Sequence, residues 1–177
     1  MAELLKSFNL QGWIDEHRDM LKPPIGAQSI WQDSEFLIMV IGGPNARRDF
    51  HIDPADEFFY QLEGEMVLEY IDQAGARQSQ QIRAGEVLLL PANTPHSPQR
   101  AANSVGLVVE RVRSPDEPEK YVWYCEQCNA RLYELSRGEG DLLQDLKKVN
   151  EDYNVNETLR NCAECGYVQP VATGPRL

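Results

Sequence analysis

The strongest constraint on the fold is a series of short β-rich segments between residues 29 and 112, separated by glycine- and proline-containing turns. No helical periodicity interrupts the series, and each segment has the length of one strand. The expected strands are residues 35–41, 57–62, 65–71, 76–82, 87–90 and 105–112. Glu63-Gly64 is typical of a tight hairpin turn between two of them, and Asp72 to Gly75 predicts the next turn. Many short strands connected in this way indicate an all-β sandwich or barrel.

An N-terminal helix is expected before the strands. Apolar residues recur at helical spacing over residues 9–22, and Pro23-Pro24 ends the segment. His17 lies on this apolar stripe, where we expect a packed helix histidine without a chemical role. We assign residues 1–114 to one barrel domain that begins with this helix.

The composition changes after residues 114–119, which are proline-rich and typical of a linker. Residues 142–153 fit an amphipathic helix with Asp141 as its candidate N-cap, and a Cys-x-x-Cys pair lies on either side. We expect residues 115–177 to form a small C-terminal appendage.

Charge and hydropathy argue against several classes of partner. The net charge of −11 disfavours nucleic acid and anionic membranes, because both require a basic surface. No apolar run approaches the roughly 20 residues of a membrane span. The first residues lack the basic and apolar regions of a signal peptide, so we expect a cytoplasmic protein.

Two of the three histidines, His51 and His96, lie in turn-bounded segments of the strand region. Together with Glu57 they form the ligand set of non-haem Fe(II) oxygenases, which leaves coordination positions open for substrate and O2. A catalytic zinc ion also accepts two histidines and a glutamate, so the ligands alone do not select the metal. Asp53 and Asp56 compete with Glu57 as the carboxylate ligand.

The tail carries a second pattern typical of a metal site. Its two Cys-x-x-Cys pairs are Cys125, Cys128, Cys162 and Cys165. In a reducing compartment, two such pairs predict a tetrahedral thiolate site for Zn or Fe. Asn129 and Gly166 follow the pairs and suit a left-handed turn. A thioredoxin-like redox pair is less favoured, because both pairs occur together without a βαβ pattern. We expect a structural role, since a tail with little core gains stability from a metal.

The strand region resembles the paired motifs of the cupin superfamily. The matching parts are Glu57-x6-Gly64, Gly85-x5-Pro91 and His96. The Glu-x6-Gly spacing favours Glu57 over both aspartates as the ligand. Asp53 replaces the second histidine of the first motif, and Asn93 replaces a glycine of the second. The resemblance implies a double-stranded β-helix, or jelly-roll barrel, with a three-ligand site.

Further motifs narrow the resemblance. They are Lys22-Pro-Pro, Arg47, Glu57-Phe-Phe-Tyr, His96-Ser-Pro-Gln-Arg100, Val109-Glu110-Arg111 and Trp123-Tyr-Cys125-x-x-Cys128. With these residues the chain resembles the bacterial 3-hydroxyanthranilate 3,4-dioxygenase family over nearly its whole length. One departure is Ala27, where the family often has asparagine, and it removes a polar contact to the substrate or to a closing loop.

The resemblance implies residue roles. Arg47 and Arg100 would hold the substrate carboxylate, because a guanidinium pairs with a carboxylate bidentately and keeps its charge. Glu110 would accept a hydrogen bond and a proton from the substrate. Glu57 would lie beside the substrate as a metal ligand. Arg48 is expected to remain at the surface.

The resemblance also implies an activity. An Fe(II) enzyme would open 3-hydroxyanthranilate with O2 to give 2-amino-3-carboxymuconate semialdehyde, the precursor of quinolinate. The pathway would be tryptophan and kynurenine catabolism or NAD synthesis. A homodimer is implied, as is a rubredoxin-like iron, or zinc, at the cysteines.

Two other classes of function remain. One is a non-catalytic cupin that binds a small anion, although the presence of all three ligands argues against it. The other is a Zn or Mn cupin with isomerase or hydrolase chemistry. Oxygen consumption with bound Fe(II) distinguishes these classes from a dioxygenase.

Overall fold

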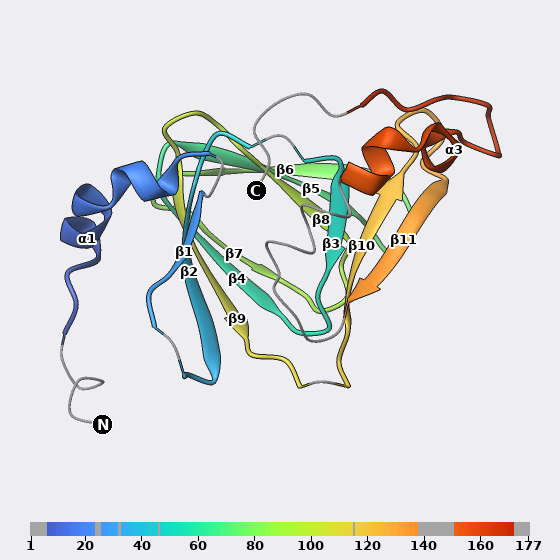
Figure 1. Cartoon of the computed structure of the whole chain (residues 1–177). Helices are drawn as coiled ribbons and strands as arrows, with labels where there is room; N and C mark the ends of the chain where they lie inside the picture. Colours follow the sequence, from blue (N-terminus) through green and yellow to red (C-terminus); the bar gives the residue numbers. More distant parts are fainter. Residues whose placement is uncertain are drawn as a thin grey trace.

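The computed structural model describes residues 7–23, 26–31, 33–45, 47–114, 116–137 and 151–171. Two antiparallel sheets form a barrel (Figure 1). The first sheet contains, in spatial order, β1 (Ala27–Ser29), β2 (Phe36–Gly42), β9 (Val105–Arg111), β4 (Glu57–Glu63) and β7 (Val87–Leu90). The second contains β11 (Arg131–Arg137), β10 (Glu119–Tyr124), β3 (Asp49–Ile52), β8 (His96–Arg100), β5 (Glu65–Ile71) and β6 (Arg77–Arg83). The all-β jelly-roll prediction is confirmed.

Strand patterning revealed six of the eleven strands that the structure describes and missed the other five. The six expected strands are confirmed as β2, β4, β5, β6, β7 and β9, whereas β1, β3, β8, β10 and β11 were not predicted. β3 and β8 have only four and five residues. Pro98 lies inside β8, where a missing N–H donor argues against a strand. Both strands bury polar residues, so hydrophobic alternation could not identify them.

The hairpin predicted at Glu63-Gly64 is wrong. Gly64 does turn the chain, with φ of 65°, but β4 pairs with β7 and β9 while β5 pairs with β6 and β8. The chain therefore crosses from one sheet to the other at this glycine and forms a corner of the barrel. The hairpin lies one turn later, where Asp72 Oδ1 accepts two backbone hydrogen bonds at 3.0 and 2.9 Å between β5 and β6.

The N-terminal helical segment is divided in two. α1 spans Leu10–Glu16, and Asn9 caps it by accepting a backbone hydrogen bond at 3.0 Å. A 3-10 helix, η2 (Arg18–Leu21), follows. The helix predicted over residues 9–22 is therefore confirmed in position, with a break at His17. None of the helices that the structure describes is long and apolar enough to cross a membrane.

Two apolar clusters stabilise the barrel and its N-terminal cover. The interior cluster is Ile41, Phe59, Met66, Leu68, Ile82, Leu90 and Val108. α1 and η2 cover the first sheet through Ile14, Leu21, Val40 and Val105. His17 stacks on Trp13 with ring centroids 4.5 Å apart, so it packs as expected for a helix histidine. Ala27 packs against the interior cluster, so an apolar contact stands where the related family often has asparagine.

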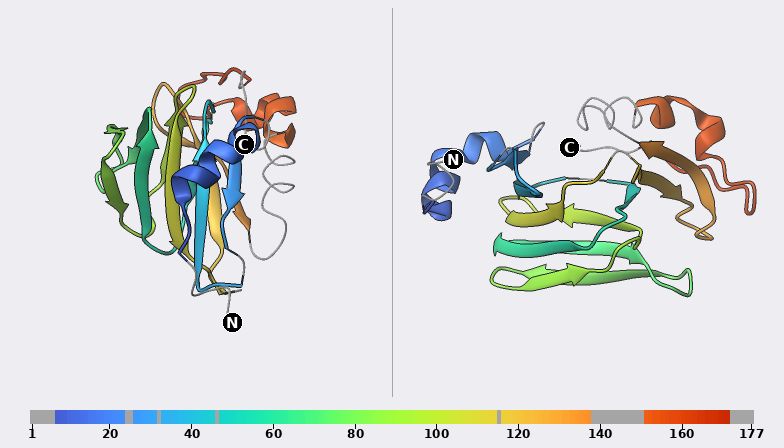
Figure 2. Two further views of the ribbon diagram at one scale, coloured as in Figure 1. Left: turned by 90° about the vertical axis from the view of Figure 1, so that its left-hand side faces the viewer. Right: turned by 90° about the horizontal axis from the view of Figure 1, so that it is seen from below.

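β10 and β11 extend the second sheet on the side of the barrel opposite α1 (Figure 2). Trp123 of β10 stacks on Tyr153 with ring centroids 4.8 Å apart, and α3 (Glu157–Arg160) follows. Of the helix predicted at residues 142–153, residues 151–153 are helical, and the rest, with the cap Asp141, lies outside the described residues. The division into residues 1–114 and 115–177 stays a prediction, and β10 pairs directly with β3 across it.

Candidate metal centres

His51, Glu57 and His96 come together inside the barrel. His51 on β3 stands opposite His96 on β8, and Glu57 begins β4. Nε2 of His96 and Nδ1 of His51 lie 3.2 Å and 3.7 Å from Oε1 of Glu57. One ligand atom from each residue lies within 4.8 Å of the others, and all three side chains are buried. Two imidazoles and a carboxylate converging in this way fit a single divalent metal ion.

The two aspartates that compete with Glu57 have roles in the loops. Asp56 is exposed, and its Oδ1 accepts a backbone hydrogen bond at 2.8 Å. Asp53 is buried, and its carbonyl oxygen accepts a hydrogen bond from the N–H of Asn93 at 2.7 Å.

Asn93, which stands in place of the motif glycine, has φ of 61°, the left-handed region that glycine adopts freely and asparagine tolerates. The replacement of the motif glycine therefore keeps the turn.

A second group, His51, Asp53 and Glu119, also has metal-ligand spacing. Arg113 occupies it from one side, with Nε 3.4 Å from Asp53 Oδ2 and Nη2 2.9 Å from Glu119 Oε1. The positive charge of Arg113 would repel a metal cation placed beside the same two carboxylates. The group also contains only one histidine, so the geometry favours the set that includes Glu57.

Glu119 is the feature of the site that sequence patterns did not reveal. It begins β10 and accepts a hydrogen bond from Nε2 of His51 at 2.7 Å. Burial opposes the charged form of His51, but the hydrogen bond to Glu119 and the charge of Glu57 raise the pKa of His51 to about 9 in the metal-free protein. In the sequence Glu119 is one more acidic residue at the end of a linker, and only the pairing of β10 with β3 distinguishes it.

Glu110 lies on β9 directly opposite Glu57 in the register of β4 and β9. Burial and then the Glu57 charge raise the pKa of Glu110 to about 8. Burial also opposes ionisation of Glu57, but His96 and His51 hold its pKa below the ordinary value. Near neutral pH the metal-free protein therefore keeps Glu57 ionised and Glu110 largely protonated.

Arg47 lies just before β3 and is anchored within the protein. Its Nε donates to Oδ2 of Asp49 at 3.2 Å, and its Nη2 donates to the same oxygen. Only 13% of the Arg47 side chain is exposed. Burial disfavours its charge, but the carboxylate of Asp49 more than compensates and raises the pKa of Arg47.

Arg100 ends β8 and is 4% exposed. Its Nη1 is buried and has no hydrogen-bond partner among the described residues. Burial and then the charge of Arg47 lower the pKa of Arg100 to about 10. The two sequence-predicted arginines are therefore close enough for their charges to interact. A Cβ on Gly106 of β9 would lie 2.6 Å from Nη1, so the guanidinium occupies space that a glycine leaves open. A buried cation with an unused donor favours an anionic ligand.

The four cysteines also converge. Sγ of Cys125 lies 3.7 Å from Sγ of Cys165, and Sγ of Cys128 lies 3.5 Å from Sγ of Cys162. A disulfide would require about 2.05 Å. Thiolates about 2.3 Å from a tetrahedral metal are about 3.8 Å apart, so the four sulfurs fit a metal ion.

The turns after each cysteine pair have the expected left-handed conformation. Asn129 has φ of 62° and Gly166 has φ of 74°. The backbone N–H groups of Cys165 and Glu164 lower the pKa of Cys162 to about 7. These donors favour the thiolate, which is the form that binds metal.

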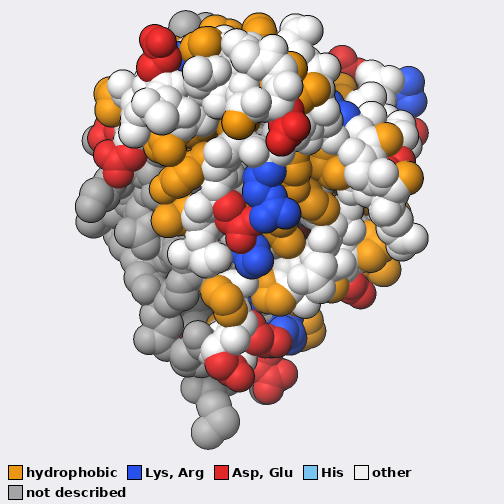
Figure 3. Space-filling model, turned by 90° about the vertical axis from the view of Figure 1, so that its right-hand side faces the viewer, with side chains coloured by type: hydrophobic (Ala, Val, Ile, Leu, Met, Phe, Trp, Pro, Cys, Tyr) orange, Lys and Arg blue, Asp and Glu red, His pale blue; other side chains and the backbone are white. Residues whose placement is uncertain are grey.

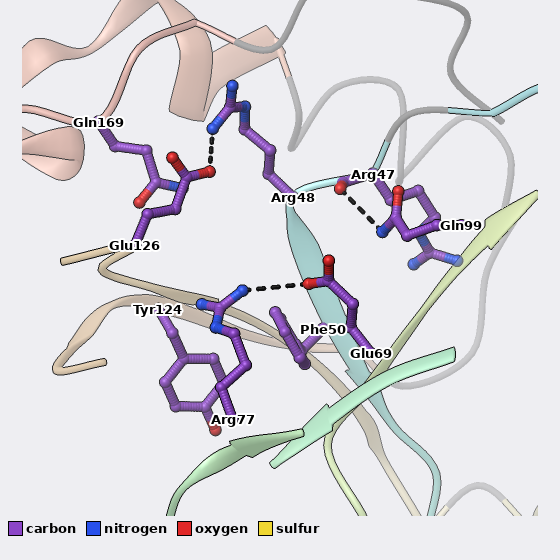
Figure 4. A pocket seen from close by; sticks show the side chains of 9 residues that line it. All are labelled: Arg47, Arg48, Phe50, Glu69, Arg77, Gln99, Tyr124, Glu126 and Gln169. Carbon is purple, nitrogen blue, oxygen red and sulfur yellow. Dashed lines mark hydrogen bonds and ion pairs between the residues drawn. The ribbon is translucent and has the colours of Figure 1, made fainter. Parts of the chain in front are cut away.

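A further cavity of about 300 Å³ lies between the second sheet and the cysteine-containing tail, and Arg47 is among its lining residues (Figure 4). Arg77 pairs with Glu69 at 3.2 Å, and Arg48 pairs with Glu126. Figure 3 shows basic and acidic side chains next to one another on the side of the molecule that carries β11. The arginines that line this cavity are already paired with acidic residues, so their charges are neutralised. Arg48 is one of these paired residues and is partly exposed.

A jelly-roll barrel that gathers two histidines and a glutamate in its interior defines a cupin with a candidate metal site. The model of the 3-hydroxyanthranilic acid dioxygenase family matches residues 3–154. The chain belongs to this family.

Curated relatives match almost end to end. A 3-hydroxyanthranilate 3,4-dioxygenase of Bacillus thuringiensis is 47% identical over 174 residues, which are 98% of this chain and 97% of the relative. One of Xanthomonas euvesicatoria is 51% identical over 167 residues, 94% of each chain. Among solved structures, a cupin-2 domain containing protein of Shewanella frigidimarina is 15% identical with a TM-score of 0.46, covering 59% of this chain and 100% of that chain.

Proposed function

We propose that this protein is an Fe(II)-dependent extradiol-type dioxygenase that converts 3-hydroxyanthranilate and O2 to 2-amino-3-carboxymuconate semialdehyde. The observation that carries the proposal is the buried convergence of His51, Glu57 and His96 in a chain of this family. Iron(II) held there would pass electrons from the substrate to O2, which zinc cannot do, and three protein ligands leave coordination positions for both reactants.

The arginines orient the substrate in this proposal. Arg100 offers its unpaired Nη1 to the ring carboxylate, and Arg47, anchored by Asp49, adds a second positive charge. A charge-assisted hydrogen bond contributes roughly 1.5–3 kcal/mol. Each Arg→Ala substitution should therefore lower kcat/KM on the order of 10- to 100-fold. The metal content should remain unchanged.

Glu110 acts as the proton acceptor in the same scheme. It lies across from the ligand Glu57, and its pKa near 8 makes its carboxylate a stronger base than an ordinary glutamate. A base with such a pKa is matched to a phenolic proton near neutral pH. The positive charge of a bound divalent metal would favour the ionised form of Glu110, which is largely protonated in the metal-free protein. This carboxylate would then take the proton of the substrate hydroxyl.

The four cysteines hold a second metal, iron of the rubredoxin type or zinc, with a structural role. Four protein ligands leave no open position for a substrate. A cytoplasmic location suits reduced cysteines. A homodimer belongs to the same proposal and rests on the family resemblance.

The test is anaerobic reconstitution with Fe(II), followed by 3-hydroxyanthranilate and air. Oxygen uptake together with near-ultraviolet absorbance of the semialdehyde is the expected result, and protein reconstituted with Zn(II) is the control. Binding of the substrate without oxygen uptake in the Fe(II) protein would instead support an anion-binding cupin. The analogue 2-aminophenol lacks the carboxylate and should be a poor substrate that responds little to Arg47→Ala or Arg100→Ala.

A further inference from the structure

We propose that Glu119 is a positioning residue that sets the orientation of the His51 ring for metal binding. The proposal rests on the proposed function only in assigning His51 as a ligand. It adds a contribution from β10, which lies beyond all the cupin motifs.

The carboxylate of Glu119 is held from three directions. Nε2 of His51 donates to Oε2 at 2.7 Å, and the hydroxyl of Tyr121 donates to the same oxygen at 3.0 Å. Nη2 of Arg113 lies 2.9 Å from Oε1. Glu119 is 2% exposed, so these interactions are sheltered from water. A buried carboxylate with this set of donors is fixed in one orientation.

The same strand also fixes the plane of the imidazole. The register of β10 and β3 sets Tyr121 opposite His51. The two rings stack with centroids 5.1 Å apart and an angle of 17° between their planes. Stacking restricts the tilt of the imidazole, and the hydrogen bond to Glu119 restricts its rotation about χ2. β10 therefore restricts both the tilt and the rotation of the His51 ring.

The two histidines present different nitrogens to Glu57. In His96 the Nδ1 atom lies 3.0 Å from the carbonyl oxygen of Thr94, and Nε2 faces Glu57 at 3.2 Å. In His51 the Nε2 atom is engaged by Glu119, and Nδ1 faces Glu57 at 3.7 Å. Hydrogen bonding of the remote nitrogen selects the tautomer and the ligand nitrogen in metal sites. We therefore expect His51 to bind through Nδ1 and His96 through Nε2.

The main test is metal affinity, measured without substrate or turnover. Glu119→Gln keeps the size of the side chain and removes its charge, and Co(II) titration of the metal-depleted protein should show weakening on the order of 10- to 100-fold at the histidine site. Tyr121→Phe keeps the carboxylate and should weaken affinity less. The matched control is Glu134→Gln, which removes a glutamate on β11 paired with Lys120 at 3.1 Å, away from His51.

Two outcomes of the affinity measurement would overturn the proposal. One is unchanged Co(II) affinity in Glu119→Gln. The other is equal weakening at the histidine and cysteine sites together with a lower Tm, which would show loss of fold and not of orientation. If dioxygenase activity is absent from the native protein while the affinity pattern holds, only the proposed function fails.

A second measurement reports on orientation directly. The chain has three histidines, so long-range ¹H–¹⁵N spectra of the Zn(II)-loaded protein are readily assigned. Metal-bound Nδ1 in His51 and metal-bound Nε2 in His96 are expected. Metal-bound Nε2 in His51 would contradict the role of Glu119, whatever the affinities show.

Discussion

Replacing Gly106 by alanine tests the carboxylate clamp without changing either arginine. The new Cβ would lie 2.6 Å from Nη1 of Arg100 and 3.1 Å from Oε1 of Gln61. Ordinary contact begins at 3.4 Å, so the guanidinium must move by about 0.8 Å, the difference between 3.4 and 2.6 Å. Gly106 lies within β9 and has no left-handed φ, so alanine suits the backbone there.

The size of the effect follows from that displacement. A shift of about 1 Å in a positioning group can cost on the order of 100-fold in rate. Loss of a charge-assisted hydrogen bond of roughly 1.5–3 kcal/mol gives a similar range. We expect kcat/KM for 3-hydroxyanthranilate to fall about 10- to 100-fold in Gly106→Ala. Iron content should not change, because the displaced group is not a ligand.

Steady-state kinetics with two substrates provide the assay. The fall should be large for 3-hydroxyanthranilate and small for 2-aminophenol, which has no carboxylate to lose. Gly12→Ala is the matched control, because the atoms nearest its Cβ belong to the side chain of Asn9, at 3.3 Å or more, on the surface helix. Equal losses for both substrates, or no loss for either, would refute the assignment of Arg100 as the carboxylate-binding group.

Three further predictions concern the ligands and the base. Glu57→Ala should remove metal from the histidine site while the cysteines keep theirs, and Asp53→Ala should not; metal analysis showing the reverse would identify Asp53 as the ligand. Cys162→Ser should lower Tm because the thiolate site contributes folding energy; a folded, iron-loaded variant without turnover would instead indicate a catalytic tail. Glu110→Gln should raise the Tm of the metal-free protein more at pH 8 than at pH 5. Equal gains in Tm at the two pH values would argue against a raised pKa of Glu110. The folded Glu110 keeps its proton to about pH 8 whereas the unfolded carboxyl loses it near 4.5, so its burial costs more stability as pH rises between these values.

Sequence reasoning reached the candidate metal ligands because they are chemically rare and regularly spaced. The chain has three histidines, and the spacing from Glu57 to Gly64 is visible without a structure. The cysteine pairs are equally distinctive. Strands of seven residues with apolar patterns, such as β4 and β5, were found for the same reason.

Features that depend on the register between distant strands were not predictable. Glu119 approaches His51 only because β10 pairs with β3, and the two residues are 68 positions apart. Gly106 contacts Arg100 across two different sheets. Nothing in the local sequence of either residue differs from that of an ordinary strand end or strand glycine. The corner at Gly64 was mistaken for a hairpin because a local turn does not reveal which sheet the next strand joins.

The pairing of β3 bears on how such a protein can be divided or recombined. β3 carries His51 and pairs with β10 at four positions but with β8 at one, the His51–His96 pair itself. A shortened chain that ended before β10 would keep every cupin motif, yet β3 would become an exposed edge with unpaired backbone groups, which is a known route to aggregation. β10 therefore has to remain with its own barrel, and tails can be exchanged between relatives only from a point beyond β10.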